Sequence, residues 1–155
     1  MKLGLLTAPF PETPLMDVAR WSAENGFESL EIACWPRTSG PTRRYAGTSH
    51  IDVANLSDTQ ARDIVDEIEA LGLTISGLGL YPNPLHPDPE HRRSVIDHLK
   101  LVIAAAQRMG VPFVNTFMGG DWKLTLDQNW QQALRVWPYI VAHANDHGIR
   151  LTIEN

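Results

Sequence analysis

The residue best suited to chemistry is Glu154, which directly follows the apolar run 151–153. A carboxylate in that place is expected to be buried, and buried charges are paired or bind metal ions. A divalent cation is a natural partner for it, so Glu154 is a candidate metal ligand. Two alternatives are an exposed chain end and a core carboxylate held by a salt bridge.

Four further polar residues lie in or after other apolar runs and are candidates for binding a substrate. Glu31 could orient a substrate hydroxyl, or it could be a structural carboxylate that is hydrogen-bonded inside the protein. Asn115 and Tyr81 lie near the ends of expected strands. His86 belongs to the proline-stiffened loop 81–87, where a histidine could contact substrate, although surface histidines are common in loops. Aromatic rings near the same ends could form a platform for a sugar ring or simply pack: Trp35, Tyr81, Phe117 and Trp122.

Composition narrows the classes of function. The chain has 155 residues and a formal net charge of −5, with a pI near 5.6. Nucleic acids and anionic membranes attract basic surfaces, so we expect neither as a partner. The single cysteine excludes an internal disulfide, and no run reaches the ~20 apolar residues of a membrane span. No signal peptide is recognisable, so the expected location is cytoplasmic.

Glycines mark four junctions at which an amphipathic helix is followed at once by a short apolar run. Glycine accepts the left-handed backbone conformation that ends a helix, so each junction predicts a helix stop and a strand start. The junction residues are Gly26, Gly72, Gly110 and Gly148. Helix starts are marked by possible caps at Thr13, Ser57, Asp88 and Thr125. The pattern predicts strands over 2–6, 29–33, 73–80, 112–117 and 149–154, with a helix between each pair.

Apolar residues at helical spacing predict one buried stripe on each of three helices. The stripes are Ala61, Ile64, Val65, Ile68 and Leu71; Val95, Leu99, Val102, Ile103 and Ala106; and Trp130, Ala133, Leu134, Trp137 and Val141.

Most expected strands are near-continuous apolar runs, which is typical of parallel strands covered on both faces. A closed (β/α)8 TIM barrel usually needs about 250 residues. We therefore expect residues 1–155 to be the first four βα units plus strand 5 of a single, incomplete TIM barrel domain, the N-terminal portion of a longer protein. The alternative fold is a self-contained five-stranded flavodoxin-like parallel sheet.

Four segments, taken in order, resemble the sugar phosphate isomerase/epimerase family with the xylose-isomerase-like TIM barrel. They are 79–85, 114–120, 136–138 and, above all, the ending Leu-Thr-Ile-Glu-Asn at 151–155. In that family the glutamate at the end of strand 5, which resembles Glu154, binds a divalent metal, often Mn²⁺, Mg²⁺ or Co²⁺. In several epimerases it is also a catalytic acid or base.

The resemblance implies an enzyme that transfers a proton next to the carbonyl of a small-molecule sugar or polyol. Glu31, Tyr81, Asn115 and His86 are the predicted substrate-binding residues. The family's other metal ligands, usually Asp, His and Glu from strands 6 to 8, have no counterpart here, so the ligand set in this chain is incomplete. One carboxylate cannot hold a cation that needs about six ligands, and we expect the chain alone to be inactive.

Two other functions are open from the sequence. An endonuclease-IV-like zinc phosphodiesterase shares the barrel, but it needs more histidine ligands and a basic groove for DNA. A non-catalytic half-barrel that binds sugar or assembles as a homo-oligomer would pair its exposed sheet edges with those of a second copy.

Overall fold

The computed structural model describes residues 2–37 and 47–154, in which five strands alternate with four helices. Asn155, the last residue of the family-like ending, lies outside these ranges. No helix within them is both long and apolar enough to span a membrane. The elements are β1 (Gly4–Leu6), α1 (Leu15–Glu24), β2 (Ser29–Ala33), α2 (Asp58–Ala70), β3 (Thr74–Gly79), α3 (Pro89–Met109), β4 (Phe113–Phe117), α4 (Leu126–Asp146) and β5 (Arg150–Glu154).

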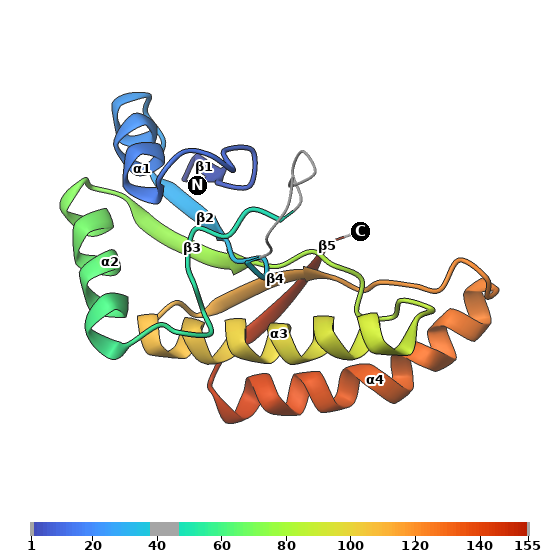
Figure 1. Ribbon diagram of the computed structural model, residues 1–155. Helices are drawn as coiled ribbons and strands as arrows, with labels where there is room; N and C mark the ends of the chain where they lie inside the picture. Colours follow the sequence, from blue (N-terminus) through green and yellow to red (C-terminus); the bar gives the residue numbers. More distant parts are fainter. Residues whose placement is uncertain (1, 38–46, 155) are drawn as a thin grey trace.

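All five strands are parallel, and they lie in the order β1-β2-β3-β4-β5 across one sheet. A flavodoxin-like sheet has the order 2-1-3-4-5, so that alternative is wrong. Figure 1 shows the strands as a curved layer with α2, α3 and α4 along its outer side. Sequential strand order with helices outside is the arrangement of a (β/α)8 barrel, and the described residues form part of one, as predicted.

Side-chain caps set most helix starts. Ser57 and Thr125 form capping boxes at the starts of α2 and α4, and Asp88 caps α3 by accepting from two backbone N–H groups. The predicted cap at Thr13 is wrong, because α1 begins after Pro14 and has no side-chain cap. Caps of this kind satisfy N–H groups that the helix itself leaves free, which is why local sequence predicts three of the four starts.

The predicted junction glycines all have a left-handed backbone. At Gly110, which follows α3, φ is 68°, and the next N–H returns to the carbonyl of Ala106 at 2.9 Å. This geometry ends the helix and turns the chain into β4. The other three junctions have φ of 81°, 78° and 69° at Gly26, Gly72 and Gly148.

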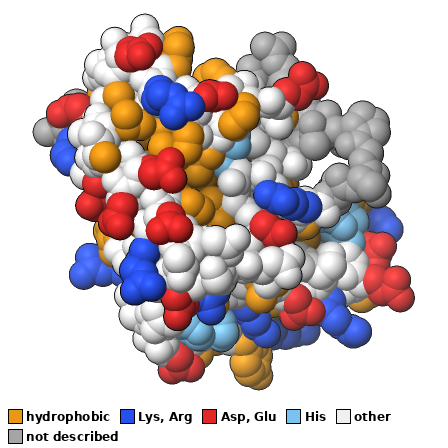
Figure 2. All heavy atoms as spheres, turned by 60° about the vertical axis from the view of Figure 1, so that its left-hand side comes forward, with side chains coloured by type: hydrophobic (Ala, Val, Ile, Leu, Met, Phe, Trp, Pro, Cys, Tyr) orange, Lys and Arg blue, Asp and Glu red, His pale blue; other side chains and the backbone are white. Residues whose placement is uncertain are grey.

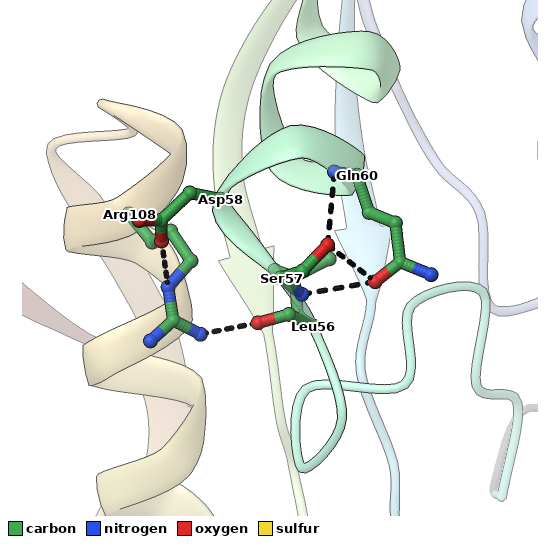
Figure 3. A network of polar contacts seen from close by, with 5 residues as sticks. All are labelled: Leu56, Ser57, Asp58, Gln60 and Arg108. Atoms are coloured by element: carbon green, nitrogen blue, oxygen red, sulfur yellow. Dashed lines mark hydrogen bonds and ion pairs between the residues drawn. The ribbon is translucent and has the colours of Figure 1, made fainter.

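Arg108, near the end of α3, fastens the start of α2. Its Nε lies 2.8 Å from Asp58 Oδ1, and its Nη1 donates to the carbonyl of Leu56 (Figure 3). The Ser57–Gln60 capping box lies beside these contacts. The first turn of α2 is therefore held both by its own side chains and by the neighbouring helix.

The core lies between the sheet and the helices. The predicted stripe on α3 is confirmed, since all of its residues are buried. The predicted stripe on α4 is partly wrong, because Trp130, Leu134 and Val141 are 56%, 52% and 42% exposed, whereas Trp137 is buried. The face of α4 that packs on the sheet is Ala133, Trp137, Ile140 and Ala144. Among the described elements, α4 packs against α3 and β5. The part of its predicted stripe that faces away from them is exposed.

The other sheet edge, at β1, also has exposed apolar residues beside it. Figure 2 shows the side of the molecule where α1 and α2 lie, with a strip of apolar side chains between acidic ones. Trp21 on α1 contacts Phe10 and Phe27, with ring centroids 6.1 and 6.0 Å apart, yet it is 47% exposed. Leu3, next to β1, is 57% exposed.

His50 ties the loop after β2 to the loop after β1. Its Nε2 lies 3.2 and 3.0 Å from the carbonyl oxygens of Phe10 and Thr13, and its Nδ1 lies 2.9 Å from Thr7 Oγ1. Two carbonyls at Nε2 require a proton there, so in the neutral ring Nδ1 accepts from the Thr7 hydroxyl. Thr7 is buried and also accepts from the N–H of Ala33. Burial lowers the pKa of His50, although the two carbonyls oppose this effect.

A lowered pKa means that the folded state favours neutral His50. We expect the free energy of unfolding to decrease as the pH falls below the ordinary histidine value of about 6.5 and on through the lowered pKa, by at most about 1.4 kcal/mol per pH unit. Urea unfolding between pH 4.5 and 8 measures this. His50→Gln should remove that part of the slope and cost about 1–2 kcal/mol at pH 7. Parallel profiles for the two proteins would contradict the assignment.

Candidate active site

The carboxyl ends of the five strands surround a cleft of about 360 Å³. A second pocket, of about 430 Å³, shares Phe117 and Glu154 with it and extends over the loop after β4. Parallel α/β proteins bind ligands at this edge of the sheet. A larger groove, of about 660 Å³, lies between α3 and α4, and neither Phe117 nor Glu154 lines it. The cleft is lined by Leu6, Ala8, Trp35, Tyr81, Phe117 and Glu154.

Tyr81 connects the two acidic residues of this region. Its hydroxyl donates to Glu31 Oε1 and lies 3.1 Å from Glu154 Oε1. The ring packs against Trp35 on one side and Phe117 on the other, with centroids 5.6 and 4.8 Å away. Burial, then the adjacent Glu31, raises the pKa of Tyr81. The phenol therefore keeps its proton and stays a hydrogen-bond donor at neutral pH.

Two glycines in β3 make room for contacts between its neighbours. Glu31 on β2 pairs in register with Gly77, and Asn115 on β4 pairs with Gly79. A Cβ at Gly77 would lie 2.9 Å from Asn115 Nδ2, and one at Gly79 would overlap Glu31 Oε1 and lie 3.1 Å from the Tyr81 ring. Because β3 has no side chain at either position, residues of β2 and β4 meet across it.

Asn115 extends this polar layer to β5. Its amide lies over Gly77 and lowers the pKa of Glu31 from across β3, and its Oδ1 accepts from Thr152 Oγ1. Both partners of Asn115 are side chains of other strands, so the layer joins β2, β4 and β5. The structure thus brings together four of the predicted site residues, Glu31, Tyr81, Asn115 and Glu154, although neither Glu31 nor Asn115 lines the two pockets.

Burial raises the pKa of Glu31, and the charge of Glu154 adds to this effect. Hydrogen bonds from Tyr81 and Asn115 oppose it. The single phenol proton faces two carboxylates and can be donated to only one at a time. A protonated Glu31 would supply the second proton, by donating to the phenol oxygen while the phenol donates to Glu154.

Glu154 is exposed, so the prediction of a buried carboxylate at this position is wrong for the described chain. The reason is that β5 is an edge strand among the described elements, where it pairs only with β4. Tyr81 supplies the hydrogen bond that Glu154 makes within the described residues.

A divalent metal would find one suitable carboxylate at the cleft. Glu154 offers hard oxygen ligands of the kind that Mn²⁺ and Mg²⁺ prefer. Within residues 2–37 and 47–154 no group of three or more His, Cys, Asp or Glu side chains is placed to hold a metal ion. The described residues therefore fit a metal as a single ligand and not as a complete site.

His86 lies apart from the other predicted site residues. Its ring packs between His91 and Trp122, with centroids 4.4 and 5.0 Å away, and its Nδ1 accepts from the N–H of Asp88. It lines neither pocket at the strand ends. Trp122, proposed as part of a sugar platform, has its place in this outer cluster instead.

Asn83, a polar residue in the loop after β3, lies at the rim of the site. Its Nδ2 donates to the carbonyl of Gly120 at 2.6 Å, and its Oδ1 accepts from the N–H of the same residue at 2.9 Å. This pair of bonds holds the loop after β4 against the loop after β3. In the sequence, its position two residues after Tyr81, beyond the end of an expected strand, marks it as a candidate site residue.

The model of the xylose isomerase-like TIM barrel family matches residues 19–155. The chain belongs to this family. Polar residues gathered at the carboxyl ends of sequential parallel strands agree with that membership. No curated protein resembles the sequence closely enough to count as a match.

Several solved structures share the fold. D-psicose 3-epimerase from Clostridium cellulolyticum H10 is 19% identical, with a TM-score of 0.71 over 99% of this chain and 52% of its own. A D-tagatose 3-epimerase-like protein is 20% identical, with a TM-score of 0.71 over 100% and 53%. A xylose isomerase domain protein from Planctomyces limnophilus is 12% identical, with a TM-score of 0.67 over 99% and 54%. The chain spans about half the length of these structures.

Gly79→Ala tests the space over β3. The added methyl group would overlap Glu31 and Tyr81, so we expect a loss of about 1–3 kcal/mol in the free energy of unfolding. Gly120→Ala is the matched control, because the nearest atom to its Cβ, Asn129 Oδ1, is 3.4 Å away. Urea unfolding measures both, and equal stability of the two variants would contradict close packing over β3.

A raised pKa means that the folded state favours protonated Glu31. The contribution of Glu31 to the free energy of unfolding is fully present below the ordinary glutamate pKa of about 4.3. It is lost as the pH rises through the raised pKa of Glu31, by at most about 1.4 kcal/mol per pH unit. Glu31→Gln should remove this loss, so its stability relative to the unmodified chain should increase from pH 4 to pH 7. Glu67→Gln, at an exposed position on α2, is the control. A relative stability of Glu31→Gln that stays constant with pH would refute the direction of the shift.

Proposed function

We propose that this protein is a sugar isomerase or epimerase that transfers a proton at a carbon next to a carbonyl group. The observation that carries the proposal is the position of Glu154, at the mouth of an aromatic-lined cleft and hydrogen-bonded through Tyr81 to a second carboxyl group. Membership of the xylose isomerase-like family and epimerase neighbours in fold support it.

The substrate class is a neutral sugar or polyol. Trp35, Tyr81 and Phe117 offer ring faces and edges to the C–H groups of a sugar. No Lys or Arg is among the described residues that line the two pockets, so these residues offer no counter-charge to a phosphate or a phosphodiester. This lining favours a sugar substrate over the nucleic acid of a phosphodiesterase.

Glu154 is the residue that would move the proton. Tyr81 binds its Oε1, which leaves Oε2 to approach the substrate carbon or a metal ion. A carboxylate base is effective when its proton acceptor is held within hydrogen-bond reach of the reacting C–H group. Glu31, Asn115 and His86 stay predicted substrate-binding residues. Glu31 and Asn115 would influence the substrate through Tyr81, because Glu31 is hydrogen-bonded to the Tyr81 hydroxyl and Asn115 lowers the pKa of Glu31.

A divalent metal belongs to the proposal as a cofactor. When bound, it would supply positive charge that stabilises the negative charge developing on the carbonyl oxygen. From this chain Glu154 would hold it, and about five further ligands must come from elsewhere. We therefore expect the 155 residues alone to be inactive.

A second candidate is a half-barrel that assembles with another copy. The exposed Trp130, Leu134 and Val141 on α4 favour it, as do Leu3 and Trp21 at the opposite edge. Apolar residues at both edges of a curved sheet are suited to contacts between two such sheets. Light scattering of the purified chain would distinguish a stable dimer from a monomer or an aggregate.

Deuterium exchange tests the proposed reaction. We expect the product of the complete reading frame, supplied with Mn²⁺, Mg²⁺ or Co²⁺, to introduce solvent deuterium at carbon in at least one neutral ketose, as measured by NMR. Glu154→Gln should slow the exchange by about 10²–10⁴-fold, since it removes the base. Glu67→Gln is the control. No exchange with any neutral ketose, or exchange that survives Glu154→Gln, would contradict the proposal.

A further inference from the structure

We propose that Tyr81 is a positioning residue for Glu154, and that a ring of side-chain contacts over the two glycines of β3 holds Tyr81 in place. The importance of this role for catalysis rests on the proposed function. The positioning itself can be tested without substrate or metal.

The contacts start and end on β5. Thr152 donates to Asn115, the Asn115 amide lies over Gly77 and lowers the pKa of Glu31, and Glu31 accepts from Tyr81. The Tyr81 hydroxyl then lies 3.1 Å from Glu154. Thr152 and Glu154 are two residues apart on one strand, so their side chains lie on the same face. The ring therefore closes on the strand from which it starts.

β5 needs such a contact more than the inner strands β2, β3 and β4 do. It is an edge strand among the described elements, and four of its five residues are exposed. Without Tyr81, the exposed Glu154 side chain would be free to adopt several rotamers. A hydrogen bond at Oε1 fixes the direction of the carboxylate and leaves Oε2 for a ligand. Partners of this kind, one contact away from a metal or a substrate, set the orientation of the ligating group.

The ring of Tyr81 also packs against Trp35 and Phe117, so its presence could be explained by packing alone. The hydroxyl separates the two explanations. Packing needs only the ring, whereas positioning needs the oxygen atom between the two carboxyl groups. Tyr81→Phe keeps the ring and removes the oxygen, and it is the variant that distinguishes them.

The first experiment uses metal-free protein labelled with ¹³C at the glutamate carboxyl groups. In Tyr81→Phe we expect the Glu154 and Glu31 carboxyl resonances both to shift, while the backbone spectrum shows a folded chain. Tyr139→Phe is the matched control, because Tyr139 is 76% exposed on α4 and its substitution should move neither resonance. A Glu154 resonance unchanged in Tyr81→Phe would overturn the proposal, whatever the Glu31 resonance does.

Glu31→Gln keeps the inference testable if Tyr81→Phe does not fold. It preserves the shape of the side chain but replaces the carboxyl group to which the phenol is hydrogen-bonded, so the Glu154 resonance should again shift although residue 31 does not touch it. A change confined to residues around 31 and 81 would overturn the ring of contacts.

The second experiment measures Mn²⁺ binding by electron paramagnetic resonance, with the product of the complete reading frame. We expect Tyr81→Phe to weaken Mn²⁺ binding by about 10–100-fold, the usual effect of losing a residue that orients a metal ligand. Tyr139→Phe should bind as the unmodified protein does. Mn²⁺ binding equal in Tyr81→Phe and the unmodified protein would refute positioning. Absence of Mn²⁺ binding in the unmodified protein would refute the metal in the proposed function, and the carboxyl resonances would still decide the role of Tyr81.

Discussion

A carboxyl group inside a curved sheet needs polar partners, and Glu31 finds them beyond its own strand. Tyr81, just after β3, donates a hydrogen bond to it, and the amide of Asn115 on β4 lowers its pKa from across β3. Both contacts depend on Gly77 and Gly79, because any side chain at these positions would occupy the space in which the polar groups meet. The arrangement of the candidate site, including the place of Glu154, follows from this one packing constraint.

The loops around the site are held by bonds of a different kind. His50 and Asn83 bind mainly to backbone groups of neighbouring loops, so they fix the shape of the rim irrespective of the side chains it presents. The interior layer, in contrast, consists of side chains bound to side chains. Substitutions in the rim would therefore alter access to the cleft, while substitutions in the layer would alter the orientation of the groups within it.

The two sheet edges show how much of a barrel's packing depends on closure. Ile153 on β5 and one flank of α4 are exposed, although both belong to apolar patterns typical of covered elements. A strand in a closed barrel has a neighbour on each side, whereas β1 and β5 each have one among the described strands. The same edge position leaves Glu154 exposed and makes its contact with Tyr81 more important for its orientation.

The sequence by itself determined the features that depend on neighbours along the chain. Ser57, Asp88 and Thr125 cap the helices that they were predicted to start, and the position of Tyr81 and Glu154 at strand ends was predictable because strand ends share one edge of a parallel sheet. Only the tertiary structure decided the strand order, the exposure of Trp130, the separate place of His86, and the meeting of Glu31 with Asn115. The physical reason is that caps and turns arise from hydrogen bonds within a few residues, whereas burial and cross-strand contacts depend on which distant segments lie side by side.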